Sequence, residues 1–148
     1  MLLTPLQFLY HYTNERDFKN ILDEKILRMS PSGPNGRYGT GVYLTSLTPD
    51  NGTDKIKKNN YDGLYKKPLY ANKTEECYLK FYKKDLDDVQ CIQTKGDRDV
   101  WLYSREINLR NLSYYSGYTD YSDTEEYHLC SSVMAFAGTQ NHTSVNLI

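Results

Sequence analysis

The feature that most limits the fold of this chain is a series of short strand-like runs with no regular helical crossovers between them. Aromatic and β-branched residues gather in these runs, and turn-forming residues separate them. The runs cover 8–12, 42–45, 76–82, 89–92 and 97–103. Parallel strands need long crossovers, so we predict an α+β fold with split, mainly antiparallel β-sheets and one N-terminal helix.

The N-terminal helix is predicted over 14–25. Phe18, Ile21 and Leu22 recur at helical spacing and give one apolar stripe. Asn14 can cap the helix, and Asp17 follows it at the spacing of a capping box. The helix should therefore begin directly after the first strand.

The remainder of the chain is less patterned. A short helix is predicted over 53–61, and the Tyr/Ser/Asp-rich segment 113–126 is interpreted as a loop. Residues 133–137 fit either a last strand or a packed helical turn. We expect a single domain over 1–148 with a flexible tail over 138–148.

Composition excludes several classes of protein. The net charge is −1, so no overall field attracts the protein to nucleic acid or to an anionic membrane. No apolar run approaches the roughly 20 residues that a membrane-spanning helix needs. The first residues lack the basic and apolar regions of a signal peptide, which favours a cytoplasmic chain by default and leaves a secreted effector as the alternative.

Metal chemistry has no support in the sequence. The three histidines are at 11, 128 and 142, and the three cysteines are at 77, 91 and 130. Neither their spacing nor their order is typical of a metal site, so none is predicted.

Two segments near the N-terminus suggest a ligand pocket. His11 lies near the end of the first apolar strand, and Tyr43 follows Gly39 and Gly41 on the next one. A polar hook followed by an aromatic platform suits a flat, nucleotide-like ring. Asp99 opens a later hydrophobic and aromatic run.

These segments resemble the ADP-ribosyltransferase superfamily over about residues 8–112. The run Tyr10-His11-Tyr12-Thr13 resembles its first motif. The stretch 27–31, continuing to 39–45, is similar to the second block of the poly(ADP-ribose) polymerases, and the run 99–103 resembles their final motif. The polymerases carry glutamate where this protein has Asp99. We therefore do not expect it to elongate an ADP-ribose polymer as they do. The closest resemblance is to the toxin-type branch whose signature is histidine, tyrosine and aspartate.

The resemblance implies a fold and an activity. The split sheets would surround an NAD cleft, and the protein would be a mono-ADP-ribosyltransferase of the glycosyltransferase class (EC 2.4.2.-). NAD+ would be its substrate, with no metal. The nicotinamide–ribose bond would break, and ADP-ribose would pass to an unidentified acceptor, a protein rather than a nucleic acid.

The resemblance also implies roles for single residues. His11 would bind a ribose hydroxyl, and the backbone of Tyr12 would pair with the nicotinamide amide. The Thr13 hydroxyl would add a contact, although capping the helix explains it equally well. Tyr43 would stack on the nicotinamide. Asp99 would bind the ribose 2′-hydroxyl and stabilise the developing cation.

Further cofactor contacts are expected from Gly41, which would let the backbone approach the ligand, and from Arg28 on the adenosine side. Tyr61 or Tyr65 would be a second stacking aromatic. Each assignment has a structural alternative: a strand histidine satisfied by backbone, a core tyrosine, a β-bulge glycine, a solvated arginine. For Asp99 the alternative is an ion pair with Arg98.

Competing assignments remain at this stage. Asp97 and Glu106 are alternative acids. The alternative functions are an NAD+ glycohydrolase and a catalytically inactive module that binds NAD+ or ADP-ribose. A tRNA 2′-phosphotransferase shares the fold, but the near-neutral charge disfavours it. In relatives, loops choose the acceptor, which here indicates 49–73 and 113–126.

Overall fold

The computed structural model describes residues 5–30, 38–61, 75–94 and 96–130. Its elements are β1 (Phe8–Thr13), α1 (Glu15–Glu24), β2 (Ile26–Leu27), β3 (Val42–Leu44), η1 (Pro49–Asn51), α2 (Thr53–Tyr61), β4 (Cys77–Tyr82), η4 (Lys83–Asp85), β5 (Gln90–Cys91), β6 (Trp101–Tyr103), β7 (Ile107–Asn108), β8 (Tyr114–Tyr118) and β9 (Tyr121–His128).

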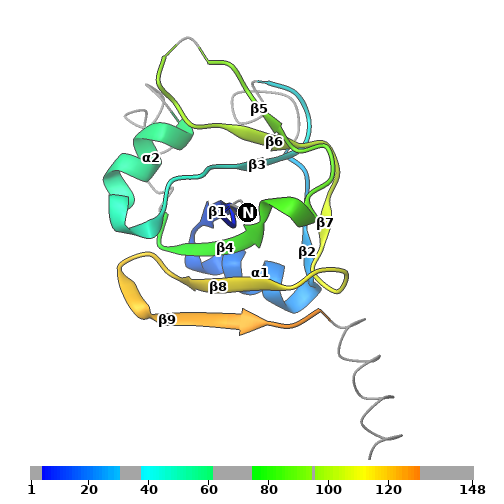
Figure 1. Ribbon diagram of the computed structural model, residues 1–148. Helices are drawn as coiled ribbons and strands as arrows, with labels where there is room; N and C mark the ends of the chain where they lie inside the picture. Colours follow the sequence, from blue (N-terminus) through cyan, green and yellow to red (C-terminus); the bar gives the residue numbers. More distant parts are fainter. Residues whose placement is uncertain (1–4, 31–37, 62–74, 95, 131–148) are drawn as a thin grey trace, which may run out of the picture.

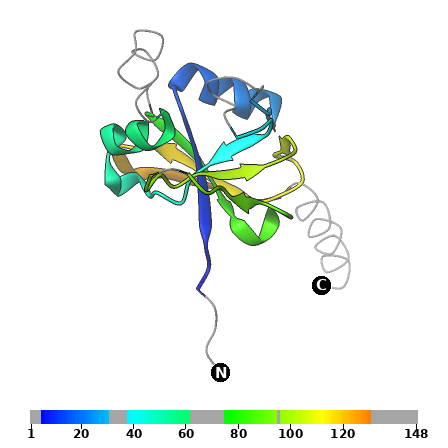
Figure 2. The same cartoon turned by 90° about the horizontal axis from the view of Figure 1, so that it is seen from above.

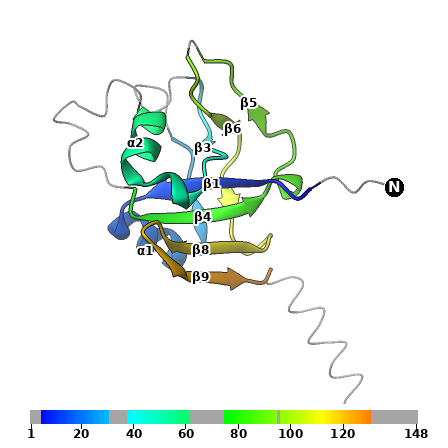
Figure 3. The ribbon, with the colours of Figure 1, turned by 60° about the vertical axis from the view of Figure 1, so that its left-hand side comes forward.

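The strands form three sheets: a larger one of four strands, a smaller one of three strands and one of two strands. Their orders are β1-β4-β8-β9, β3-β6-β5 and β2-β7. Figures 1 and 3 show the strands of the two larger sheets one after another, with β3 next to β1. Every strand pairing in the described ranges is antiparallel. The predicted α+β class with split, mainly antiparallel sheets is therefore confirmed, and α2 adds the second helix expected over 53–61.

In the part of the chain that the structure describes, a single pair of residues connects the backbones of the two larger sheets, between β1 and the end of β3. Tyr10 and Thr45 exchange both backbone hydrogen bonds, with N···O distances of 2.7 and 2.9 Å. No other backbone pair joins these two strands within the described residues. The sheet is thus split between β1 and β3, while β1–β4 and β3–β6 are regular ladders.

The two faces of β1 pack against different helices. Leu9 belongs to the larger hydrophobic cluster, together with Phe18 of α1. Tyr10 and Tyr12 belong to a smaller cluster with Ile56 of α2. Because successive side chains of a strand point to opposite faces, α1 and α2 cover opposite faces of β1. Figure 2 shows the two helices on either side of that strand.

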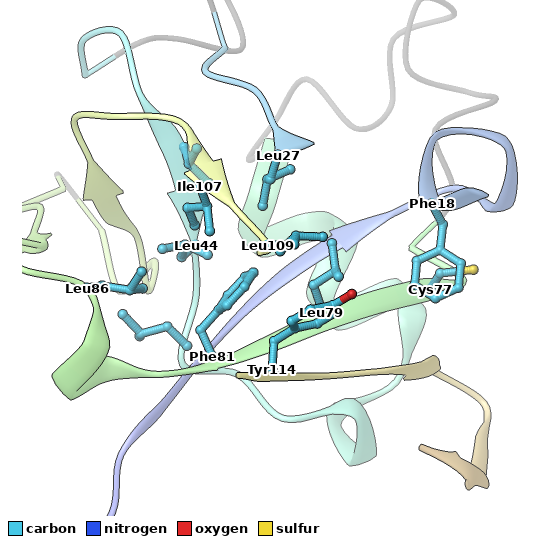
Figure 4. Packing of buried hydrophobic residues seen from close by; sticks show 12 residues of the cluster. Phe18, Leu27, Leu44, Cys77, Leu79, Phe81, Leu86, Ile107, Leu109 and Tyr114 are labelled. Carbon is cyan, nitrogen blue, oxygen red and sulfur yellow. The ribbon is translucent and has the colours of Figure 1, made fainter. Parts of the chain in front are cut away.

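The larger cluster fixes how β3 and β4 sit relative to each other. Figure 4 shows Leu44 of β3 and Phe81 of β4 turned into the same cluster. Leu79 and Phe81 have no solvent exposure, and Leu44 is 3% exposed. Burial of side chains of this size contributes about 1.5–3 kcal/mol each. This cluster holds the two sheets together where hydrogen bonds between β1 and β3 stop.

The N-terminal helix begins and ends close to the predicted boundaries. The Asn14 Oδ1 atom accepts from the Asp17 N–H at 2.8 Å, and the Asn14 amide donates to the Asp17 carboxylate at 3.1 Å. Asn14, and not Thr13, is therefore the cap. Lys25, with φ of 62°, adopts the left-handed conformation that ends the helix.

The prediction of a loop over 113–126 is wrong. This segment contains β8 and most of β9, which pair as an antiparallel hairpin at the edge of the larger sheet. Most side chains of β9 are exposed, so its sequence needs no apolar alternation. Pairing with β8, and not hydrophobic periodicity, keeps this strand extended.

The strand predicted over 97–103 is shorter than expected. Only Trp101–Tyr103 forms β6, and Asp99 precedes it. The backbone N–H and C=O of Asp99 bond to the side chain of Asn59, at 2.7 and 2.8 Å, and not to a neighbouring strand. The predictions for 133–137 and 138–148 lie outside the described residues. Over the ranges that are described, no helix combines the length and apolarity that crossing a membrane requires.

Replacing Gly41 by alanine should destabilise the fold. A Cβ atom there would lie 2.5 Å from the carbonyl oxygen of Tyr103 and 2.6 Å from Leu102 Cδ1. Overpacking of this kind costs about 1–3 kcal/mol. Gly96→Ala is the matched control, because nothing lies within 4 Å of its Cβ position. Chemical denaturation measures both variants, and equal stabilities would contradict the close packing of Gly41 on β6.

His128 should make stability depend on pH. Its ring stacks on Tyr114 and its Nε2 lies 2.7 Å from Ser116 Oγ; burial lowers its pKa below the ordinary 6.5. Below pH 6.5 the unfolded chain therefore binds the proton first, so the free energy of unfolding falls as pH decreases towards the lowered pKa. His128→Gln should flatten this fall in urea titrations at stepped pH. An unchanged slope would contradict the burial effect.

Candidate functional site

The three residues expected to carry chemistry come from neighbouring parts of the two larger sheets. His11 is on β1, Tyr43 is on β3, and Asp99 lies just before β6, the strand that pairs with β3. The split between β1 and β3 therefore separates His11 from Tyr43 and Asp99.

His11 bridges the split with its side chain. Its Nδ1 lies 3.0 Å from the carbonyl oxygen of Tyr43. A carbonyl only accepts, so Nδ1 carries the proton and Nε2 keeps a lone pair. Burial lowers the pKa of His11, although the Tyr43 carbonyl and the charge of Asp17 oppose this shift. The imidazole is therefore neutral at pH 7, with an acceptor nitrogen that has no partner within the described residues.

A surface cavity of about 260 Å³ lies beside His11, on the α1 side of the sheet. Thr13 and Arg28 also line it, and Arg28 forms an exposed ion pair with Glu24 at 3.0 Å. The remaining lining residues are Asp17, Asn20, Ile21, Glu24, Ile26, Leu27 and Ser30. The cavity is slightly smaller than the roughly 300 Å³ at which small-molecule sites begin, and both polar and apolar side chains line it.

Tyr12 leaves open backbone groups at the split. Its side chain is buried, and its hydroxyl donates to the Leu47 carbonyl at 2.7 Å, so the side chain packs. Its backbone must face β3, because alternate residues of an antiparallel strand turn their N–H and C=O groups to the same edge as Tyr10. No backbone group in the described ranges pairs with them.

Tyr43 lies on the opposite face of the split from His11. It shares a face with Thr45, which pairs with Tyr10, whereas His11 shares a face with Leu9. The Tyr43 hydroxyl donates to the Gly39 carbonyl at 2.5 Å and accepts from the Tyr38 N–H at 3.0 Å. Partial burial raises the pKa of this phenol. The ring is thus held by the segment that enters β3.

The carboxylate of Asp99 is fixed by the residues that follow β3. Its Oδ1 accepts from Thr45 Oγ1 at 3.0 Å and from the Ser46 N–H at 2.7 Å, and its Oδ2 accepts from the Ser46 hydroxyl. A carboxylate has about four lone-pair sites. Within the part of the chain that the structure describes, these three bonds leave one lone-pair site on Oδ2 without a partner.

The expected alternative for Asp99, an ion pair with Arg98, is not the arrangement found. The Arg98 guanidinium donates to the carbonyls of Asn59 and Asn60, at 2.7 and 2.9 Å. These carbonyls end α2, where the helix dipole favours a cation. Arg98 therefore anchors α2 instead of neutralising Asp99.

Sequence reasoning missed the groups that hold Asp99. Thr45 and Ser46 directly follow the Tyr43 strand, so a search for polar residues at strand ends could have found them. Asn59 gives no such signal, because it lies in a Lys- and Asn-rich helix more than 35 residues before Asp99. Only the packing of α2 brings the two residues together.

The other predicted site residues have mixed placements. Gly41 is required by its close packing on β6, whatever its role toward a ligand. Tyr61 is the last residue of α2, and Tyr65 lies outside the described residues. Asp97 and Glu106 are exposed. The part of the chain that the structure describes holds no group of three or more potential metal ligands.

The structure thus brings two sets of residues to the split from opposite faces. His11, Thr13 and Arg28 line the cavity on the α1 side. Tyr43 and Asp99 lie on the α2 side, connected through Tyr38, whose hydroxyl is 3.4 Å from Arg98 Nη1. The backbone of Tyr12 lies between the two sets. The two sets therefore lie on opposite faces of the sheet, and the cavity beside His11 is lined by the first set.

Comparison with known proteins identifies the family. Neither the curated proteins nor the solved structures contain a significant match to the chain. The model of one protein family, described as HYD1 signature containing ADP-ribosyltransferase, matches residues 9–111, which is more than two thirds of the chain. That range includes the whole of the site described above. The chain therefore belongs to this toxin-type family of ADP-ribosyltransferases, whose superfamily uses NAD+ as substrate.

Proposed function

We propose that the protein is a mono-ADP-ribosyltransferase in which NAD+ passes through the split between β1 and β3. The observation that carries this proposal is the strand edge at Tyr12, whose backbone has no backbone partner in the described ranges, beside a neutral His11 whose Nε2 can accept a hydrogen bond. Adenosine lies on the α1 side, nicotinamide lies at the split, and the nicotinamide ribose lies toward Asp99.

The adenosine side uses the cavity beside α1. His11 Nε2 accepts from a ribose hydroxyl, and the bond from Nδ1 to the Tyr43 carbonyl keeps the ring in the required tautomer. Arg28 reaches the same cavity and contacts the adenosine side, while Thr13 adds a hydroxyl at its rim. The cavity of about 260 Å³ takes one part of a dinucleotide, so the rest must extend into the split.

The nicotinamide carboxamide pairs with Tyr12 as a further strand would. The carboxamide offers one carbonyl acceptor and an amide donor, and the strand edge offers the complementary N–H and C=O. This pairing uses backbone alone, which explains how a buried packing side chain can occupy the position. The Tyr43 ring packs against the nicotinamide from the β3 side, and Gly41 lets this strand approach.

Asp99 stabilises the charge that develops during bond cleavage. The bond between the ribose C1′ and the nicotinamide nitrogen breaks, and nicotinamide leaves as a neutral molecule with the electron pair. The ribose then carries oxocarbenium-like charge. The free lone pair of Asp99 Oδ2 accepts from the 2′-hydroxyl and places negative charge beside the cation. The acceptor nucleophile bonds to C1′ and loses its proton.

The acceptor is proposed to be a protein. The net charge of −1 gives no general attraction for a nucleic acid backbone. The segment 113–126, which we expected to choose the acceptor as a loop, is a hairpin at the far edge of the larger sheet. Of the other expected segment, 49–73, residues 62–73 lie outside the described residues. Its first part, 49–61, contains η1 and α2, lies beside Asp99 and is the better candidate.

Release of nicotinamide from NAD+ tests the reaction. We expect the wild-type protein to release nicotinamide, alone or with a cell extract that supplies acceptors. Asp99→Ala should lower the rate by about 10²–10³-fold, because one preorganised electrostatic contact is lost. Its affinity for NAD+ should stay within several-fold. Asp97→Ala, an exposed acid two residues away, is the matched control and should keep the wild-type rate.

The other outcomes separate the alternatives. NAD+ binding without release by the wild type would favour an inactive binding module. Release without transfer of label to any macromolecule would favour an NAD+ glycohydrolase. Loss of activity in Asp97→Ala with retention in Asp99→Ala would move the catalytic carboxylate to the competitor.

The role of His11 is tested by affinity. His11→Ala removes one hydrogen bond to ribose, which contributes about 0.5–1.5 kcal/mol, so the Kd for NAD+ should rise about 2- to 10-fold. Titration calorimetry in the Asp99→Ala background avoids turnover during the measurement. His128→Gln, which changes a histidine on the distant hairpin, should keep the affinity. Equal affinities of His11→Ala and its parent would remove His11 from the binding site.

A further inference from the structure

Asn59 of α2 holds the backbone of Asp99 through a reciprocal pair of hydrogen bonds. The Asp99 N–H donates to Asn59 Oδ1 at 2.7 Å, and Asn59 Nδ2 donates to the Asp99 carbonyl at 2.8 Å. A side-chain amide thus takes the place of a neighbouring strand. The bond lengths are those of good backbone hydrogen bonds.

This clamp matters because Asp99 lies outside every sheet ladder. The residue precedes β6, and its N–H and C=O have no strand partner in the described ranges. Asn59 Nδ2 also lies 3.3 Å from Thr45 Oγ1, which itself donates to the Asp99 carboxylate. One amide therefore contacts both the backbone of Asp99 and a residue that orients its side chain.

Asn59 is itself firmly placed. The Arg98 guanidinium donates to the Asn59 carbonyl, and Ile56, one turn earlier on α2, is fully buried in the cluster with Tyr10 and Tyr12. The helix cannot rotate or withdraw without exposing Ile56. The orientation of Asp99 therefore depends on the hydrophobic packing beneath α2.

We propose that Asn59 is a positioning residue, which keeps the carboxylate of Asp99 on Thr45 and Ser46 with its free lone pair turned to the ribose. The inference rests on the proposed function and goes beyond it, because Asn59 acts through Asp99 and touches no substrate atom. It assigns α2 a catalytic purpose beyond packing.

The test compares Asn59→Ala with Asn60→Ala. Asn60 is the next residue of the same helix, and its side chain donates to Glu75 Oε2 at 3.0 Å and accepts from Asn59 Nδ2 at 3.4 Å. Within the described residues it makes no hydrogen bond to Asp99, so Asn60→Ala leaves both bonds from Asn59 to the Asp99 backbone in place. Asn59→Ala should lower kcat for nicotinamide release by about 10- to 100-fold, since misplacement of a catalytic group costs this much. The KM for NAD+ should change less than about threefold. Asn60→Ala should keep the wild-type kcat.

A second variant, Asn59→Asp, keeps the inference testable if Asn59→Ala does not fold. Asn59→Asp keeps an acceptor for the Asp99 N–H and loses the donor to the Asp99 carbonyl, so its kcat should also fall while circular dichroism shows a folded protein. Wild-type kcat in folded Asn59→Ala or Asn59→Asp would overturn the inference, as would an equal loss in Asn60→Ala.

Hydrogen exchange of the Ser46 backbone amide tests the position of Asp99 without requiring enzymatic activity. The Ser46 N–H donates to Asp99 Oδ1 at 2.7 Å, so its exchange rate reports whether the carboxylate is in place. In Asn59→Ala, exchange at Ser46 should accelerate relative to the wild type and to Asn60→Ala. If the wild-type protein released no nicotinamide but Ser46 exchange still accelerated, the proposed function would fail and the positioning would stand. Unchanged Ser46 exchange in Asn59→Ala would overturn the positioning.

Discussion

The site depends on the point where β1 and β3 stop pairing. Tyr10 and Thr45 exchange both backbone hydrogen bonds, and directly beyond them the Tyr43 carbonyl bonds to the His11 imidazole. The side chain thus takes the place of a ladder hydrogen bond where the backbone pairing ends. The larger hydrophobic cluster stabilises this arrangement, because it packs β3 on β4 without further hydrogen bonds from β1.

This arrangement has two consequences for chemistry. The imidazole receives a fixed tautomer at the contact where the backbone pairing of β1 and β3 ends. Among the described residues, no backbone group pairs with Tyr12 at an edge that would be paired in a continuous sheet. An open edge is normally a liability, but here it is short and flanked by the packing of α1 and α2 on opposite faces.

Much of this organisation follows from local sequence pattern. The strand around His11, the helix capped by Asn14 and the strand of Tyr43 are all visible as short-range periodicity and turn chemistry. The hairpin β8–β9 was not visible, because β9 is mostly exposed and carries no apolar alternation. The position of Asp99 outside β6 was also missed, since its backbone partner is a side chain in another element.

The sequence by itself determined the antiparallel class, the first helix and which residues carry an imidazole, a phenol and a carboxylate. Periodicity and capping act between residues a few positions apart, so these patterns can be recognised in the sequence without knowledge of the fold. Only the tertiary structure decided that His11 and Asp99 approach the split from opposite faces, and that Asn59 holds the backbone of Asp99. Those relations depend on how helices pack across a sheet, and such long-range contacts leave no local pattern.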